Sequence, residues 1–302
     1  MDEFFTGNAL KEIIDNKIHR LTPLIKLGVS IEELKERISK KEEKKLFLNF
    51  KKKIENNINN NKFSIIAEMK QKSPSAGNII YGKDYNPVEI AKIYNNNKAT
   101  CLSVLTEQDY FNGDMIHIRE IKEEGIKIPI LSKDFFVHKW QLYYAKSEGA
   151  DAILIILAGI GKKLANELYE EALKLNLSVI IEVHTIEEAE YALSFKDALI
   201  GINNRNLKTL KTDIHTTYEI NNTLRNCSGP RGPRVTARFT DCKVRTGKWS
   251  VRTTVSRLLF RARLIFFGSV SCLLTESWSS RMSKCFSSVS RLGKVEDSDD
   301  FL

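Results

Sequence analysis

The sequence has little cysteine and no long apolar run. It contains five cysteines in 302 residues, and the four beyond residue 221 lack the paired C-x-x-C spacing that is typical of zinc sites. No apolar run approaches the roughly 18 residues that a membrane helix needs. The first five residues carry acidic side chains where a signal peptide carries basic ones. We therefore expect a soluble, cytoplasmic protein with no metal and no membrane partner.

A glycine-rich dinucleotide fingerprint is also absent. No Gly-x-Gly-x-x-Gly follows the first apolar run, so the usual support for a dinucleotide-binding fold is missing. The chain is otherwise ordinary for a globular protein, with 28% charged and 42% hydrophobic residues. Its length is compatible with two domains, or with one α/β barrel of roughly 250 residues.

The positive charge is confined to the C-terminal part. Up to residue 221 the chain has 32 basic and 32 acidic residues, whereas residues 222–302 have 15 basic and 6 acidic ones. Arginine replaces lysine at the same point, and isoleucine nearly disappears. This break indicates two different kinds of sequence joined near residue 222.

Helical and strand patterns follow one another in a regular order. The first sixty residues have apolar positions at steps of three and four, which predict helices. Apolar runs and polar helical stretches then alternate about every 27 residues, which is the length of one strand and helix unit. This rhythm predicts a parallel sheet, either a doubly wound sheet or a barrel. The six predicted strands are 63–69, 99–105, 128–131, 150–157, 177–183 and 198–202.

Polar residues cluster where these strands end, which favours the barrel, because barrel enzymes build their sites at that end. The alternation of a strand puts Glu68 and Lys70 on the same face, so we expect an ion pair between them. Together the strand ends can donate a proton, accept one and hold an anion. The residues concerned are Glu68, Lys70, Lys133, Asp134, Glu182, His184, Asn203 and Arg205.

Several of these residues also have a purely structural interpretation. His184 has no second histidine or cysteine nearby, so we expect a hydrogen-bonded structural residue. The small-residue loop around Ser73 could hold phosphate through its backbone amides or form a simple tight turn. Phe111 and Phe135 could line an aromatic pocket or pack beneath a loop.

The motifs, taken in order, closely resemble those of the indole-3-glycerol-phosphate synthase family. The resemblance covers roughly residues 8–221, including a helical extension in front of the barrel. The matching motifs are Ile66-Ala67-Glu68-Met69-Lys70 with Ser73-Pro74-Ser75, Leu102-Ser103-Val104-Leu105-Thr106-Glu107 with Tyr110-Phe111-Asn112-Gly113, Lys133-Asp134-Phe135, Gly149-Ala150-Asp151, Glu182-Val183-His184, and Gly201-Ile202-Asn203-Asn204-Arg205-Asn206-Leu207.

The resemblance implies a carboxy-lyase of tryptophan biosynthesis that needs no cofactor or metal. Its substrate would be 1-(2-carboxyphenylamino)-1-deoxyribulose 5-phosphate, whose indole ring is closed with loss of carbon dioxide and water. By the same resemblance, Lys133 is the general acid and Glu182 assists proton removal. Lys70 faces the carboxylate or acts as a second acid, held by Glu68, and Asn203 orients a hydroxyl group.

The resemblance also implies residues that hold the rest of the substrate. Ser73 and Arg205 would help to bind the phosphate group, and Phe111 and Phe135 would enclose the anthranilate ring. The implied fold is a (β/α)8 TIM barrel whose last two β/α units are missing or replaced. The implied domains are a helical extension (1–60), six β/α units (61–221) and a non-matching tail (222–302).

The tail departs from the family pattern. The expected Ser-Glu-Ser-Gly motif of a seventh strand is absent, and so is the phosphate loop after an eighth. Such loops usually bind the phosphate in barrels. The apolar run at 264–274 could supply one strand but hardly two, which leaves unpaired strand edges. We therefore expect residues 222–302 to be mostly disordered or loosely packed, and synthase activity to be low.

Three origins of the tail remain open, and two functional classes follow from them. The tail could be a frame-shifted or fused segment, which we favour, an arginine-rich segment that binds nucleic acid, or a divergent end of the barrel. No nucleic-acid motif or aromatic platform accompanies the arginines, so we expect no nucleic-acid partner. The protein is then either an active carboxy-lyase or an inactive or binding form that retains six units.

Overall fold

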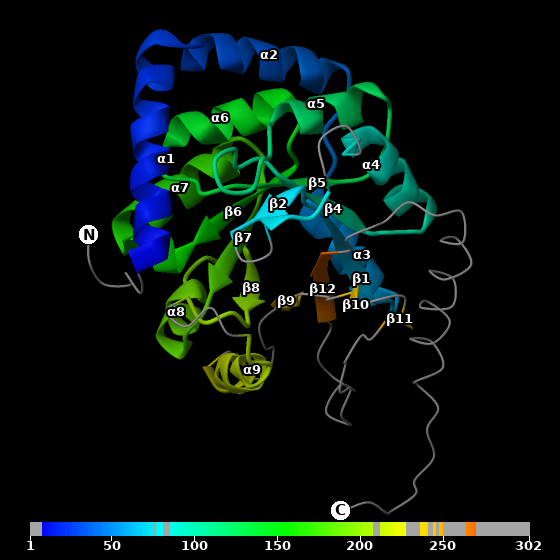
Figure 1. Cartoon of the computed structure of the whole chain (residues 1–302), viewed down its shortest axis with the longest axis vertical. Coiled ribbons are helices and arrows are strands. Elements are labelled where there is room, and N and C mark those ends of the chain that lie inside the picture. Colours follow the sequence, from blue (N-terminus) through cyan, green and yellow to red (C-terminus); the bar gives the residue numbers. More distant parts are fainter. Residues whose placement is uncertain are drawn as a thin grey trace, which may run out of the picture.

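The centre of the molecule is a closed barrel of parallel strands (Figure 1). The computed structural model describes residues 8–74, 77–80, 85–207, 212–227, 236–240, 244–245, 248–249 and 264–269. Neighbouring strands around the barrel follow the order β1-β4-β5-β6-β7-β8-β9-β12, and β12 pairs with β1 to close it. Their bounds are β1 Ser64–Met69, β4 Cys101–Leu105, β5 Ile130–Lys133, β6 Ala152–Ile156, β7 Ser178–Val183, β8 Leu199–Asn203, β9 Thr236–Thr240 and β12 Leu264–Ser269.

The first six barrel strands confirm the prediction from the apolar runs. Each begins and ends within two residues of its predicted bounds. β6, with the sequence Ala-Ile-Leu-Ile-Ile, is buried at its first four positions and half-buried at the last. Continuous apolar runs of this kind form because strands of a parallel barrel are covered on both faces, by the barrel interior and by the surrounding helices.

Helices cover the outside of the barrel between successive strands (Figure 1). Among the residues that the structure describes, no helix is long and apolar enough to cross a membrane. The outer helices are α4 Pro87–Asn96, α5 Ile116–Glu123, α6 Lys139–Glu148, α7 Lys162–Lys174, α8 Ile186–Ala192 and α9 His215–Cys227, and a short 3-10 turn, η2, spans Leu157–Gly159.

The N-terminal extension forms three helices with different places in the fold. α1 (Asn8–Leu27) contacts η2, and α2 (Ile31–Glu43) packs on α6. Ser30 and Glu33 begin α2 with a capping box, in which each side chain accepts a backbone N–H of the other residue. α3 (Phe50–Asn59) buries its apolar face against the barrel interior at the amino-terminal ends of the strands. Ile66, Leu131 and Ile180 belong to the same apolar cluster as this face. The amino-terminal end of the barrel is thereby closed by α3.

Two segments of the tail complete the barrel, which corrects the expectation of at most one additional strand. β9 pairs with β8, and β12 lies between β9 and β1. The prediction that the tail is mostly disordered or loosely packed stays a prediction for the rest of residues 222–302. α9 also runs across residue 222, where the sequence placed the boundary.

Among the described residues, no helix follows β9 or β12, so replacement of the last two β/α units stays a prediction. A short antiparallel pair, β10 (Val244–Arg245) and β11 (Lys248–Trp249), stands between them in the sequence. A second short pair, β2 (Lys72–Ser73) and β3 (Gly77–Asn78), follows β1. The other residues of the tail, including any that the sequence predicts to be disordered, lie outside the described part of the chain.

Candidate active site

The interior of the barrel changes from apolar to charged along its axis. Ile66 on β1, Leu131 on β5 and Ile180 on β7 are completely buried near α3. Because side chains alternate between the two faces of a strand, the residues two positions further on share their face. Those residues are Glu68, Lys133 and Glu182. The sequence therefore places charged groups in the barrel at the carboxyl ends of its strands.

Lys133 lies between two buried carboxylates. Its Nζ atom is 3.7 Å from Oε2 of Glu68 and 3.8 Å from Oε2 of Glu182. The Lys133 side chain is 19% exposed, whereas those of Glu68 and Glu182 are 8% and 5% exposed. A half-buried ammonium group with carboxylates on two sides can donate a proton or stabilise a developing negative charge.

Glu68 also holds the second lysine of the site. The Nζ atom of Lys70 is 2.9 Å from Oε1 of Glu68, so the ion pair predicted from strand alternation is present. The two oxygens of Glu68 thus face two different ammonium groups, Lys70 and Lys133. This carboxylate keeps both ammonium groups at the mouth of the barrel.

Asn203 and His184 surround the Glu182 carboxylate. Nδ2 of Asn203 donates a hydrogen bond of 2.9 Å to Oε1 of Glu182, and Nε2 of His184 lies 3.3 Å from the same oxygen. Burial opposes the charged carboxylate, but Lys133, His184 and Asn203 together outweigh it and lower the pKa of Glu182 to about 2. Glu182 is therefore ionised at neutral pH.

His184 is held between two carboxylates. Its Nδ1 atom is 3.5 Å from Oε2 of Glu188, the oxygen that also accepts the His184 backbone N–H at 2.7 Å. Burial opposes the charged imidazole, but the two glutamates raise the pKa of His184 to about 9. The structural role expected for His184 stays a prediction, and the sequence did not predict its contact with the Glu182 carboxylate.

The remaining predicted site residues lie in loops around this centre. Ser73 is buried in β2, directly after β1, and Arg205 follows β8. The backbone N–H of Arg205 donates to Oδ1 of Asn203 at 3.0 Å. The rings of Phe111 and Phe135 are both half-buried, with centroids 6.3 Å apart and planes inclined at 41°. The structure thus groups the five predicted catalytic residues in the centre and the four predicted binding residues in surrounding loops.

A second buried ion cluster was not predicted from the sequence. Lys17 on α1 lies between Glu107, just after β4, and Asp134, just after β5. Of the three lysines of α1, Lys11 and Lys26 are exposed, whereas Lys17 is buried. Its position at steps of three and four from Ile14 and Leu21, on the apolar face of the helix, is the signal that could have found it. Among the described residues, no group of three or more histidine, cysteine, aspartate or glutamate side chains is arranged to hold a metal ion.

Comparison with known proteins identifies related chains. The model of the family described as indole-3-glycerol phosphate synthase matches residues 10–228. A protein of that name from Aquifex aeolicus is 46% identical, over 52% of this chain and 59% of the relative. One from Thermoanaerobacter sp. (strain X514) is 45% identical, over the same shares of the two chains. The chloroplastic protein of Arabidopsis thaliana is 42% identical, over 52% of this chain and 39% of the relative.

Proposed function

Because the chain belongs to the indole-3-glycerol phosphate synthase family, we propose that it closes the indole ring of 1-(2-carboxyphenylamino)-1-deoxyribulose 5-phosphate. The chain spans about 59% of the length of the two bacterial relatives named above. The products would be indole-3-glycerol phosphate, carbon dioxide and water. The position of Lys133 between Glu68 and Glu182 is the observation that supports this reaction best.

Ring closure requires an acid at the ketone of the substrate, and Lys133 fits this role. An aromatic carbon of the substrate attacks the ketone carbon, and the ketone oxygen takes up a proton to become a hydroxyl group. The Lys133 ammonium group donates this proton, while the carboxylates of Glu68 and Glu182 hold it in position. Carbon dioxide then leaves, and the electron pair of its bond returns to the ring system.

The final loss of water requires a proton acceptor and an acid for the departing hydroxyl group. Glu182 is ionised and positioned by Asn203, so it accepts the proton from the ring carbon. Lys133 or Lys70 returns a proton to the leaving hydroxyl, and Lys70 also faces the substrate carboxylate before it is lost. Asn203 orients a substrate hydroxyl, since its amide lies beside Glu182.

The outer loops would bind the two ends of the substrate. Phe111 and Phe135 would enclose the anthranilate ring, and they lie on neighbouring loops with their ring centroids 6.3 Å apart. Ser73 and Arg205 stand after β1 and β8, on either side of the two closing strands, and would help to bind the phosphate group. A cytoplasmic location stays a prediction, since the plant relative is named chloroplastic.

The test replaces Lys133 by methionine in the purified chain and follows indole-3-glycerol phosphate formation by its fluorescence. We expect turnover to fall at least about a hundredfold, the usual effect of losing a general acid. Lys127→Met is the matched control, because Lys127 is exposed in the loop before β5, at the opposite end of the strand that carries Lys133, and should leave turnover unchanged. Near-normal turnover of Lys133→Met would remove Lys133 from this role. No turnover of the unaltered chain would support the inactive alternative.

A further inference from the structure

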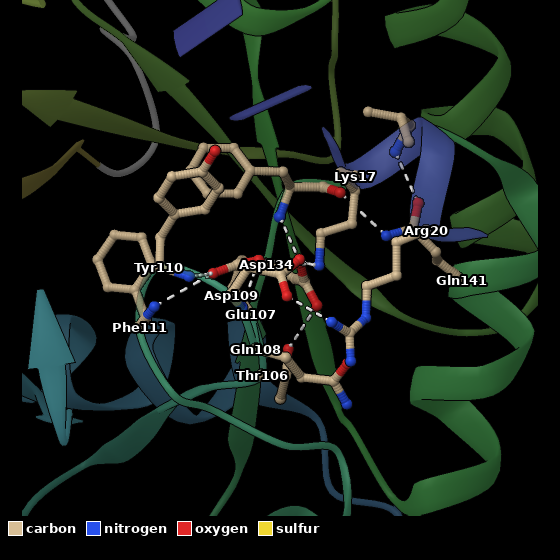
Figure 2. Close-up of polar contacts among 12 residues, drawn as sticks. Lys17, Arg20, Thr106, Glu107, Gln108, Asp109, Tyr110, Phe111, Asp134 and Gln141 are labelled. Carbon is tan, nitrogen blue, oxygen red and sulfur yellow. Dashed lines mark hydrogen bonds and ion pairs between the residues drawn. The ribbon is translucent and has the colours of Figure 1, made fainter. Parts of the chain in front are cut away.

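A buried ion cluster joins the N-terminal extension to the mouth of the barrel. Nζ of Lys17 lies 2.7 Å from Oδ1 of Asp134 and 3.5 Å from Oε1 of Glu107. The Lys17 side chain is 5% exposed, and those of Glu107 and Asp134 are 1% and 4% exposed. Figure 2 shows Lys17 reaching from α1 toward these two carboxylates. The buried Lys17 ammonium group therefore forms ion pairs with two buried carboxylates on different loops.

Glu107 organises the loop that follows β4. Its Oε2 atom accepts the backbone N–H groups of Tyr110 at 2.8 Å and Phe111 at 3.2 Å, and its Oε1 atom accepts that of Asp109 at 3.2 Å. The Glu107 backbone carbonyl also accepts the N–H of Gly113 at 2.7 Å. The backbone of the loop surrounds this carboxylate. The conformation of the loop therefore determines the position of Phe111 relative to Phe135.

Asp134 performs a similar task on the neighbouring strand. It follows Lys133 directly, and its Oδ1 atom accepts the backbone N–H of Phe135 at 2.8 Å. Thr106 donates its hydroxyl to Oδ2 of Asp134 at 3.1 Å, which ties the ends of β4 and β5 together. Burial raises the pKa of Asp134 in spite of the attraction of Lys17, and Glu107 raises it further. The Lys17 cation between them offsets the repulsion of the two buried carboxylates.

Two exposed contacts accompany the buried one on the same face of α1. Arg20 pairs with Asp109, and Asn16 donates a hydrogen bond to the hydroxyl of Tyr110. Both contacts reach the same loop, which follows β4. Exposed polar contacts of this kind contribute little to stability, because water screens them. The buried Lys17 therefore contributes most to the attachment of α1 to this loop.

We propose that Lys17 is a positioning residue for the aromatic side of the active site. By neutralising Glu107 and Asp134 together, it holds the loop after β4 and the start of the loop after β5 in one arrangement. Phe111 and Phe135, one on each loop, then form one aromatic surface, with ring centroids 6.3 Å apart, against which a planar ring can pack. The identity of that ring rests on the proposed function, whereas the holding of the loops does not.

The test compares Lys17→Met with the matched control Lys26→Met, which changes an exposed lysine on the same helix. The first measurement is hydrogen exchange of the Tyr110 and Phe111 amides in the full chain. We expect exchange about tenfold faster in Lys17→Met, the effect of weakening a charge-assisted hydrogen bond, with no change in Lys26→Met. Amides of β7 should be unaffected in both variants. Unchanged exchange at Tyr110 and Phe111 would overturn the proposal.

The second measurement is the binding of anthranilate, the aromatic part of the proposed substrate, followed by its own fluorescence. We expect Lys17→Met to weaken binding about tenfold and Lys17→Arg, which retains the charge, to restore most of it. In an active chain, Lys17→Met should raise KM more than it lowers kcat. Faster exchange with unaltered anthranilate binding would overturn the role in positioning the aromatic site. A chain that binds anthranilate but shows no turnover would overturn the proposed function alone.

A third variant keeps the test decisive if Lys17→Met does not fold. Glu107→Gln retains the pair between Lys17 and Asp134 and removes only the charged anchor of the loop. We expect the same acceleration of exchange at Tyr110 and Phe111, because an amide oxygen accepts their N–H groups more weakly than a carboxylate does. Full protection of these amides in Glu107→Gln would contradict the proposal.

Discussion

Replacing His184 by glutamine should remove a pH-dependent part of the stability. The imidazole is buried between Glu182 and Glu188, at 3.3 Å and 3.5 Å, and its folded pKa is raised from 6.5 to about 9. A base whose pKa is raised on folding stabilises the fold fully below its unfolded pKa, and this stabilisation is lost as the pH rises through the folded pKa. The relevant window therefore runs from pH 6.5 to about 9.

The magnitude follows from the size of the shift. A rise from 6.5 to about 9 corresponds to about 3 kcal/mol of unfolding free energy, since one pKa unit is worth about 1.4 kcal/mol. The lowered pKa of Glu182 reflects the same contact and is not added to this value. The unaltered protein should therefore lose about 3 kcal/mol through His184 between pH 6 and 9, and His184→Gln should lack this loss.

Urea unfolding at several pH values and constant ionic strength measures the effect. Lys146 titrates in the upper part of the range, because burial lowers its pKa to about 8, and it changes stability in the opposite direction. Since both proteins contain Lys146, the difference between them isolates His184. Parallel pH dependences in the two proteins would refute the reasoning, and so would a His184 titration midpoint near 6.5 in an NMR experiment.

Three further substitutions test other parts of the structure. Glu68→Gln should lower turnover, because Lys70 and Lys133 lose the carboxylate that holds both ammonium groups in place; wild-type turnover would make Glu68 merely structural. Lys122→Met should lower the free energy of unfolding, measured by urea titration, by about 3–5 kcal/mol. The substitution leaves the buried Asp151 carboxylate, which lies 2.6 Å from the Lys122 ammonium group, without its cation. The double variant Lys122→Met with Asp151→Asn should recover part of this loss. Gly113→Ala should lower the free energy of unfolding by about 1–3 kcal/mol and speed proteolysis of the loop after β4. The new methyl group would lie 2.3 Å from the backbone carbonyl oxygen of Leu105. Resistance to protease equal to that of the unaltered protein would contradict this.

The local pattern of the chain predicts much of the barrel and of its charged centre. Six apolar runs about 27 residues apart specify six strands, because a buried parallel strand must be apolar on both faces. The same alternation places Glu68, Lys133 and Glu182 on the inward face, two residues beyond Ile66, Leu131 and Ile180. These features depend only on the spacing of neighbouring residues.

Closure of the barrel depends on contacts between distant segments. β9 has the sequence Thr-Ala-Arg-Phe-Thr, which is short and carries a charge, so its pattern alone does not predict a strand. The unpaired backbone groups of β8 and β12 offer it two partners, and pairing on both sides decides its conformation. The strand forms because of its neighbours rather than because of its own propensity.

The two buried ion clusters, around Lys17 and around His184, also depend on contacts between distant segments. The pattern of α1 puts Lys17 on the buried face of the helix, but only the fold sets Lys17 and His184 beside buried carboxylates from other elements. A sequence pattern specifies which face of a helix or strand a residue occupies, but a charge interaction depends on which distant groups meet that face and how much water they exclude. For this reason the strands and the central charges could be predicted from the sequence, whereas the attachment of α1 and the partners of His184 became visible only in the folded chain.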